Sequence, residues 1–135
     1  MTLIEVVVAL AITGVTVAGV VSGYIYCTTA TTKDALYMAA NSRATERLEE
    51  VRAAVWNIGI YPNIDQLMSN NFPPVTVTLN KDGTGSDVTT ATITTTILPI
   101  SDTPPLRRIR VDCVWLFQGK ETITNTIETC RAPTQ

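Results

Sequence analysis

Histidine is absent from this 135-residue chain, and cysteine occurs only three times. Without an imidazole the chain has no histidine base and no histidine metal ligand, and no Cys-x-x-Cys pair suggests a zinc site. The sequence also lacks a glycine-rich phosphate loop, a serine-centred nucleophile motif and a pair of acids at catalytic spacing. We therefore expect no enzyme, and no metal or cofactor site.

Charge is nearly missing from the first 32 residues, where Glu5 is the only charged side chain. The uncharged stretch 6–27 holds 22 residues, and a helix of that length spans roughly 33 Å, enough to cross a bilayer. A removable signal peptide is the alternative, but it needs basic residues before the apolar run, and the first basic residue is Lys33. We predict a hydrophobic transmembrane helix over residues 1–27.

The motif TLIEVVVAL at residues 2–10 resembles the mature N-terminus of type IV pilin-like proteins, the N-methylated pilins and the pseudopilins of type II secretion. In that family a basic leader is cut off before residue 1 and the new amino terminus is methylated, which would make Met1 the modified residue. Phe is usual at residue 1, and many members carry Pro where this chain has Ser22. The resemblance covers about the first 25 residues. Met1 as a simple initiator is the alternative.

Glu5 is the residue on which this resemblance depends most. A carboxylate at mid-membrane costs about 2.5–3.5 kcal/mol. The resemblance implies a filament with the helix 1–27 in its core. There the α-amino group of Met1 on one subunit reaches Glu5 of a neighbour, helped by the partial positive charge of the helix N-terminus. Leaving one partner of a buried pair alone costs about 3–5 kcal/mol, so pairing selects the axial register. The alternative is a Glu5 that lies at the headgroup level of an ordinary anchor.

Small residues in the apolar helix favour close packing between helices. Gly14, Gly19 and Gly23 are the candidate packing positions, and Gly19 with Gly23 forms a GxxxG pair. Simple tolerance of glycine in membrane helices is the alternative.

An amphipathic continuation of the helix is predicted over residues 28–57. Apolar residues recur there at three- and four-residue spacing, which is typical of one buried stripe. The threonines at 28–32 weaken the helix locally, and residues 57–59 are expected to end it. The predicted stripe consists of Leu36, Ala40, Ala44, Leu48, Val51 and Val55.

The remainder predicts an α+β fold, in which the long helix packs on a small antiparallel sheet of about four strands. Residues 58–74 connect the two, with a short helix as an option at 64–68. Residues 75–135 form the head domain, one face of which the helix covers. Strands are predicted at 75–79, 88–100, 108–117 and 121–129, with turns at 81–87 and 118–120.

Cys113 and Cys130 flank the last predicted hairpin. Pilin-like proteins often close a C-terminal loop with a disulfide, and the resemblance implies this pair. The bond would contribute roughly 3 kcal/mol in the chain-entropy model. The register is unfavourable, because a three-residue turn puts the two sulfurs on opposite faces unless a bulge intervenes. Cys27 would remain a small apolar residue of the helix interface.

Arg107, Arg108 and Arg110 form the only basic cluster. Arg108 and Arg110 alternate onto one strand face and could meet phosphate. With a net charge of −2, however, the chain has no large basic surface. We favour a solvated sheet edge protected by charge and disfavour nucleic-acid binding.

These observations predict a structural subunit of an extracellular type IV pilus-like filament, a homopolymer whose subunits reside in the inner or cytoplasmic membrane before assembly. The resemblance implies an assembly machine with a cytoplasmic ATPase. A minor pilin or a type II secretion pseudopilin, with a role in DNA uptake as a further option, is the alternative. The 23 threonines suit strands, and on an exported filament some could carry O-linked glycan.

Overall fold

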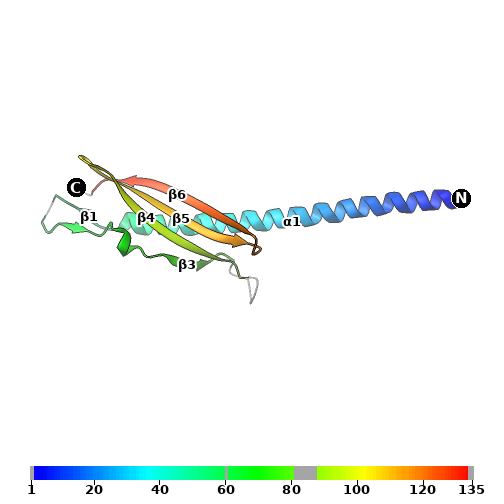
Figure 1. The fold of residues 1–135 in the computed structure, drawn as a ribbon, viewed down its shortest axis with the longest axis horizontal. Helices are drawn as coiled ribbons and strands as arrows, with labels where there is room; N and C mark the ends of the chain where they lie inside the picture. Colours follow the sequence, from blue (N-terminus) through cyan, green and yellow to red (C-terminus); the bar gives the residue numbers. More distant parts are fainter. Residues whose placement is uncertain (1, 60, 81–87, 134–135) are drawn as a thin grey trace. The chain divides into compact units, whose positions relative to one another are not determined.

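The computed structural model describes residues 2–59, 61–80 and 88–133, and it confirms the predicted α+β fold class (Figure 1). The chain divides into two units, residues 1–35 and residues 36–135, and helix α1 contributes to both. In chain order the elements are α1 (Leu3–Ala53), β1 (Trp56–Asn57), β2 (Ile64–Asp65), the 3-10 helix η1 (Ser69–Asn71), β3 (Val75–Thr78), β4 (Thr90–Asp102), β5 (Pro105–Phe117) and β6 (Glu121–Arg131).

The first unit is the apolar part of α1. Every side chain from residue 2 to residue 28 is exposed, and α1 contains a stretch long and apolar enough to cross a membrane. An exposed apolar surface of this size needs a lipid or protein environment. The unit is therefore compatible with membrane anchoring.

The threonines at 28–32 do not interrupt α1, which runs unbroken for 51 residues. Their hydroxyls donate to backbone carbonyls one turn earlier: Thr28 to Tyr24 at 3.1 Å, and Thr32 to Thr28 at 2.9 Å. Thr29 and Thr31 do the same. Such back-bonding satisfies the hydroxyls inside the helix, so the weak helix propensity of this segment does not break it.

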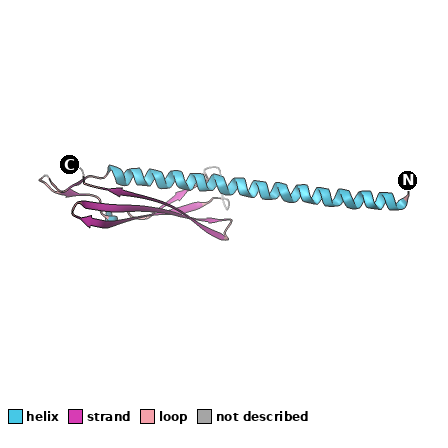
Figure 2. Ribbon diagram, turned by 90° about the horizontal axis from the view of Figure 1, so that it is seen from above, coloured by secondary structure: helices cyan, strands magenta, loops and turns pink. Residues whose placement is uncertain are grey.

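In the second unit the α1 residues from Leu36 onward cover one face of the sheet (Figure 2). The stripe predicted from periodicity is confirmed at five positions, Leu36, Ala40, Ala44, Leu48 and Val51, which are all buried. The sixth position, Val55, lies beyond the helix end and is exposed, so its assignment to the stripe is wrong.

Helix α1 ends at Ala53, earlier than the predicted end at 57. Trp56 instead begins β1 and pairs with Asp65 of β2. The indole is buried, and the Arg107 guanidinium lies 4.5 Å from the centre of its ring. This contact with a strand distant in sequence outweighs the local helical preference of residues 54–57.

The optional helix at 64–68 does not form. Asp65 lies in β2, and its carboxylate accepts hydrogen bonds from the Arg107 guanidinium at 2.6 and 2.8 Å and from the Leu67 N–H at 3.1 Å. Leu67 is buried in the core. These contacts hold the segment in an extended conformation, and a single 3-10 turn follows at η1.

The main sheet has the order β3-β4-β5-β6, with every neighbouring pair antiparallel. A bulge between Pro99 and Ser101 shifts the β4–β5 register, whereas β5 and β6 pair without interruption. The predicted turn at 118–120 is confirmed, and Gln118 and Gly119 both have positive φ, which a type I′ turn requires at its two central residues. The predicted turn at 81–87 lies outside the described residues.

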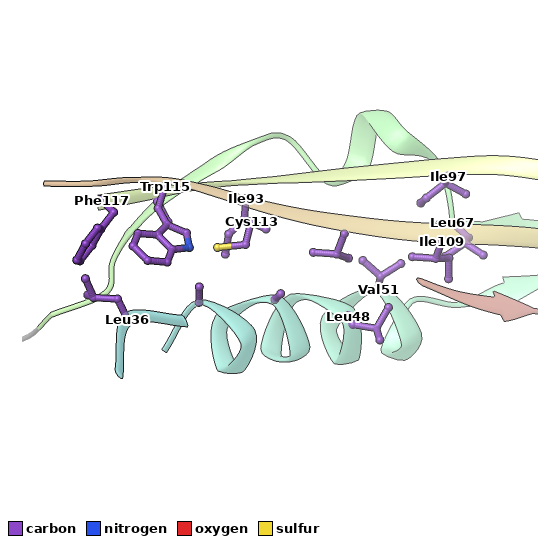
Figure 3. Close-up of a cluster of buried hydrophobic side chains, with 14 of the residues drawn as sticks. Leu36, Leu48, Val51, Leu67, Ile93, Ile97, Ile109, Cys113, Trp115 and Phe117 are labelled. Atoms are coloured by element: carbon purple, nitrogen blue, oxygen red, sulfur yellow. The ribbon is translucent and has the colours of Figure 1, made fainter. Parts of the chain in front are cut away.

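The core lies between the second part of α1 and the inner face of the sheet (Figure 3). The alternation predicted for β5 is confirmed, because every second side chain from Ile109 to Phe117 is buried. In Figure 3 the labelled side chains of the strands point toward Leu36, Leu48 and Val51 of the helix. Two layers thus enclose one hydrophobic core.

The disulfide predicted between Cys113 and Cys130 is wrong, because all three cysteines are free. Cys113 lies opposite Asn125 on the ladder, whereas Cys130 lies opposite Arg108, five positions away along β5. That offset is about 17 Å, and a disulfide needs Cα atoms about 4.4–6.8 Å apart. Cys113 is also buried and Cys130 exposed, so the three-residue turn puts them on opposite faces, and no bulge corrects the register. Burial raises the pKa of the Cys113 thiol.

Candidate functional site

Glu5 closes the first turn of α1 against the residue that precedes the helix. The backbone N–H of Thr2 donates to Glu5 Oε2 at 2.7 Å, and the backbone N–H of Glu5 donates to the Thr2 carbonyl at 3.1 Å. Thr2 is the N-cap and Glu5 the third helical residue, which is the spacing of a capping box. Glu5 therefore satisfies an N–H that the helix would otherwise leave without a partner.

The hydrogen bond from the Thr2 N–H to the Glu5 carboxylate is a site feature that the sequence reasoning missed, although the Thr-x-x-Glu signature was present in the motif. This hydrogen bond uses only one of the two carboxylate oxygens of Glu5. A carboxylate has two acceptor oxygens, and the Thr2 N–H occupies only Oε2. Oε1 of Glu5 can still accept hydrogen bonds from an ammonium group. The predicted partner, the amino group of Met1, lies outside the described residues.

An open groove runs along the apolar part of α1. Gly14, Ala18 and Ser22 follow one another at four-residue spacing, so they form one small-residue strip on one side of the helix. No atom lies within 4 Å of where a Cβ of Gly14, Gly19 or Gly23 would be, so all three positions have room for a side chain. The residues that line the groove are Leu10, Thr13, Gly14, Val17, Ala18, Val21 and Ser22.

The three predicted packing glycines do not lie on the same side of the helix. Gly14 lines it, whereas Gly19 and Gly23 do not. At about 100° per residue, Gly19 lies roughly 140° around the helix axis from Gly14, so the GxxxG pair is on a different side. Ser22 is the groove residue that sequence reasoning missed. The spacing of Gly14, Ala18 and Ser22 is the signal that would have found it.

The three arginines of the basic cluster have different surroundings. We call the sheet face that points away from α1 the outer face; it carries the even-numbered residues of β3, β5 and β6, and those of β4 up to Leu98. Arg108 and Arg110 both lie there, as predicted. Arg107 instead makes an ion pair with Asp65, so it fastens the connecting segment to β5.

Acids neutralise much of the remaining basic charge. The Arg110 Nε lies 2.9 Å from the Asp112 carboxylate and 3.8 Å from a Glu128 oxygen. Asp112 also accepts a hydrogen bond from the Thr126 hydroxyl at 2.6 Å. Arg108 is the only one of the three arginines without an ion pair among the described residues. Such a surface offers phosphate little net attraction.

Within the described ranges, no three His, Cys, Asp or Glu side chains are close enough together to hold a metal ion. No protein-family model, no curated protein and no solved structure matches the chain. The two local features of α1, the capped acid and the small-residue groove, therefore carry the functional argument.

Proposed function

We propose that this protein is a structural subunit of an extracellular filament of the type IV pilus kind, polymerised through its N-terminal helices. One observation supports the proposal above the others. Helix α1 presents only exposed side chains from residue 3 to residue 28, and that apolar surface holds a single acid in its first turn. A plain membrane anchor has no need for that acid.

The environment of the apolar segment would change during assembly. Before assembly, lipid of the inner or cytoplasmic membrane covers it. In the filament, the helices of other subunits replace the lipid. Because lipid tails are as apolar as leucine, this exchange is driven by close packing and polar pairing rather than by the hydrophobic effect. The groove with Gly14, Ala18 and Ser22 is suited to such packing, since small side chains let two helix backbones approach.

Glu5 would supply the polar pairing. Its cap on the Thr2 N–H leaves Oε1 able to accept from the Met1 amino group of a neighbouring subunit. An unpaired acid at mid-membrane costs about 2.5–3.5 kcal/mol, so a subunit gains most in the register that brings the two charges together. An assembly machine would lift each subunit from the membrane into that register.

Substitution of Glu5 tests the proposal, and two variants separate its two roles. Glu5→Gln keeps the capping group, since glutamine also serves in a capping box, but removes the charge. Glu5→Val removes both. We expect both variants to enter the membrane and to lose most of the sheared filament fraction, measured by electron microscopy and immunoblotting.

Glu46→Gln is the matched control, because Glu46 is an exposed acid of α1 with its own partner, Arg43. This variant should assemble like the wild type. Wild-type filament yield from Glu5→Gln would show that the ion pair is not needed and would reject the proposed mechanism.

A minor pilin or a type II secretion pseudopilin remains the second candidate, favoured by Met rather than Phe at residue 1. It uses the same helix contacts and differs in stoichiometry. Helical reconstruction of native filaments separates the two: a major subunit repeats along the whole shaft, whereas a minor one does not.

A further inference from the structure

Threonine dominates the outer face of the sheet. The register places Thr76 directly opposite Thr92, and Thr78 opposite Thr90. The outer-face threonines are Thr76 and Thr78 on β3, Thr90, Thr92, Thr94 and Thr96 on β4, and Thr122, Thr124 and Thr126 on β6. Eight of these nine side chains are exposed, and Thr96 is half-buried.

The hydroxyls of these threonines differ from those of α1 in their bonding. In α1, seven threonine hydroxyls donate to backbone carbonyls of their own helix. On the outer face, only the Thr126 hydroxyl makes a hydrogen bond to another described residue, through Asp112. Of the other eight threonines, seven are exposed and Thr96 is half-buried, so at least seven of these side chains are accessible to solvent and to reagents.

Among the described residues, the strand positions in one half of the outer face carry no charged side chain. The charged side chains Arg108, Arg110, Asp112 and Glu128 gather toward one end, where Arg110 of β5 lies opposite Glu128 of β6. At the other end, Val114 and Leu116 of β5 lie opposite Thr124 and Thr122. High β propensity accounts for threonine in a strand, but an exposed strand commonly carries charged residues that keep copies apart. A neutral hydroxyl face lacks that protection unless something covers it.

We propose that this neutral half of the outer face is an O-glycosylation surface. The preferred acceptors are Thr76 and Thr78 on β3 and Thr122 and Thr124 on β6, because β3 and β6 are the edges of the sheet and a transferase can approach them from the open side. The threonines of β4 are flanked by strands on both sides. This proposal rests on the proposed function in one respect: the head domain must be exported, so that a transferase outside the cytoplasm can reach it.

The transfer needs no redox partner. The donor is a sugar linked through its anomeric carbon to a phosphate leaving group. A bond forms between threonine Oγ1 and the anomeric carbon, the bond from that carbon to the phosphate oxygen breaks, and the hydroxyl proton leaves with the phosphate. Neighbouring acceptors are about 5–7 Å apart on a sheet, so we expect fewer sugars than hydroxyls.

Mass spectrometry of the protein from its native membranes and filaments tests the proposal. We expect the intact mass to exceed the sequence mass by multiples of a sugar residue, with the sugars located by electron-transfer fragmentation on β3 and β6. Peptides that contain Thr28 to Thr32 should be unmodified. A mass explained by the sequence and N-terminal methylation alone would overturn the proposal, and so would sugars found only off the outer face.

A quadruple variant, Thr76→Val, Thr78→Val, Thr122→Val and Thr124→Val, removes the hydroxyls and keeps β-branched side chains. It should lose at least half of the sugar mass, whereas the matched control, Thr28→Val with Thr29→Val, should keep all of it. Unchanged sugar mass in the quadruple variant contradicts the proposal, and protease resistance of the head shows that the variant folds. Because sugar mass is read on membrane-extracted subunits, missing filaments with retained sugar contradict only the filament proposal.

Discussion

Arg107 and Asp65 form the ion pair that fixes the connecting segment. Two guanidinium nitrogens bond the two carboxylate oxygens at 2.8 and 2.6 Å, and the guanidinium also donates to the Leu67 carbonyl. The same guanidinium lies over the Trp56 ring. One arginine therefore holds β1, β2 and β5 together. Its hydrogen bonds lower the pKa of Asp65 from its usual value of 3.8, and the pair raises the pKa of Arg107.

The lowered pKa of Asp65 predicts a loss of stability in acid. A carboxyl with a depressed pKa in the folded state stabilises the fold above its unfolded pKa, and this contribution disappears as the pH falls through the folded value. We expect the thermal midpoint of the head to fall below about pH 4, and Asp65→Asn to show a smaller fall over that range. Melting curves followed by circular dichroism between pH 2 and 7 measure this. Parallel pH profiles for the two proteins would contradict it.

At the scale of the elements, local sequence patterns were enough to predict the regular structure. The long apolar run and the 3.6-residue repeat after it predicted α1 and five buried positions, and alternation together with β-branched composition predicted the four strands of the main sheet. The predictions are wrong at positions where a contact with a residue distant in sequence determines the local structure. The end of α1 depends on the contact between Trp56 and Arg107, and β2 depends on the Asp65 ion pair. Neither partner can be read from a window of neighbouring residues.

The groove on α1 predicts that the two glycine positions differ in assembly. Gly14→Leu fills the floor of the groove, whereas Gly19→Leu adds the same side chain on a side of the helix that the groove does not include. Both changes favour the helix equally, since leucine has the higher helix propensity. We expect Gly14→Leu to cut filament yield at least tenfold and Gly19→Leu to cut it less than threefold, measured by shearing and immunoblotting.

Membrane fractionation is the control for that pair, because both variants should insert like the wild type. Equal losses from the two substitutions would show that the groove does not select a packing face.

At the scale of the whole molecule, the two parts of α1 have different environments: the first is exposed and apolar, and the second packs against the sheet. Its residues 3–28 are all exposed, whereas the segment from Leu36 to Val51 contributes a buried stripe to the head. Glu5 could be found in the sequence because a lone acid in an apolar run is conspicuous. The hydrogen bond between Thr2 and Glu5 and the strip from Gly14 to Ser22 also have signals in the sequence, the Thr-x-x-Glu spacing and the four-residue repeat of small residues, but the sequence reasoning did not use them. The pairing of Glu5 with Met1 of another subunit stays a prediction, because it joins two chains.

The separation of the two units predicts that the head folds without the apolar segment. The buried core residues lie between Leu36 and Phe117, and the partly buried Ile123 and Ile127 pack against them, so a fragment that starts at Lys33 keeps the whole core. We expect it to be soluble without detergent, monomeric by light scattering and cooperatively unfolded by heat, and to form no filaments. The matched control adds Val51→Asp, which places a charge at a fully buried position and should abolish cooperative unfolding. A fragment that aggregates or melts without cooperativity would show that the head needs the first 32 residues for its stability.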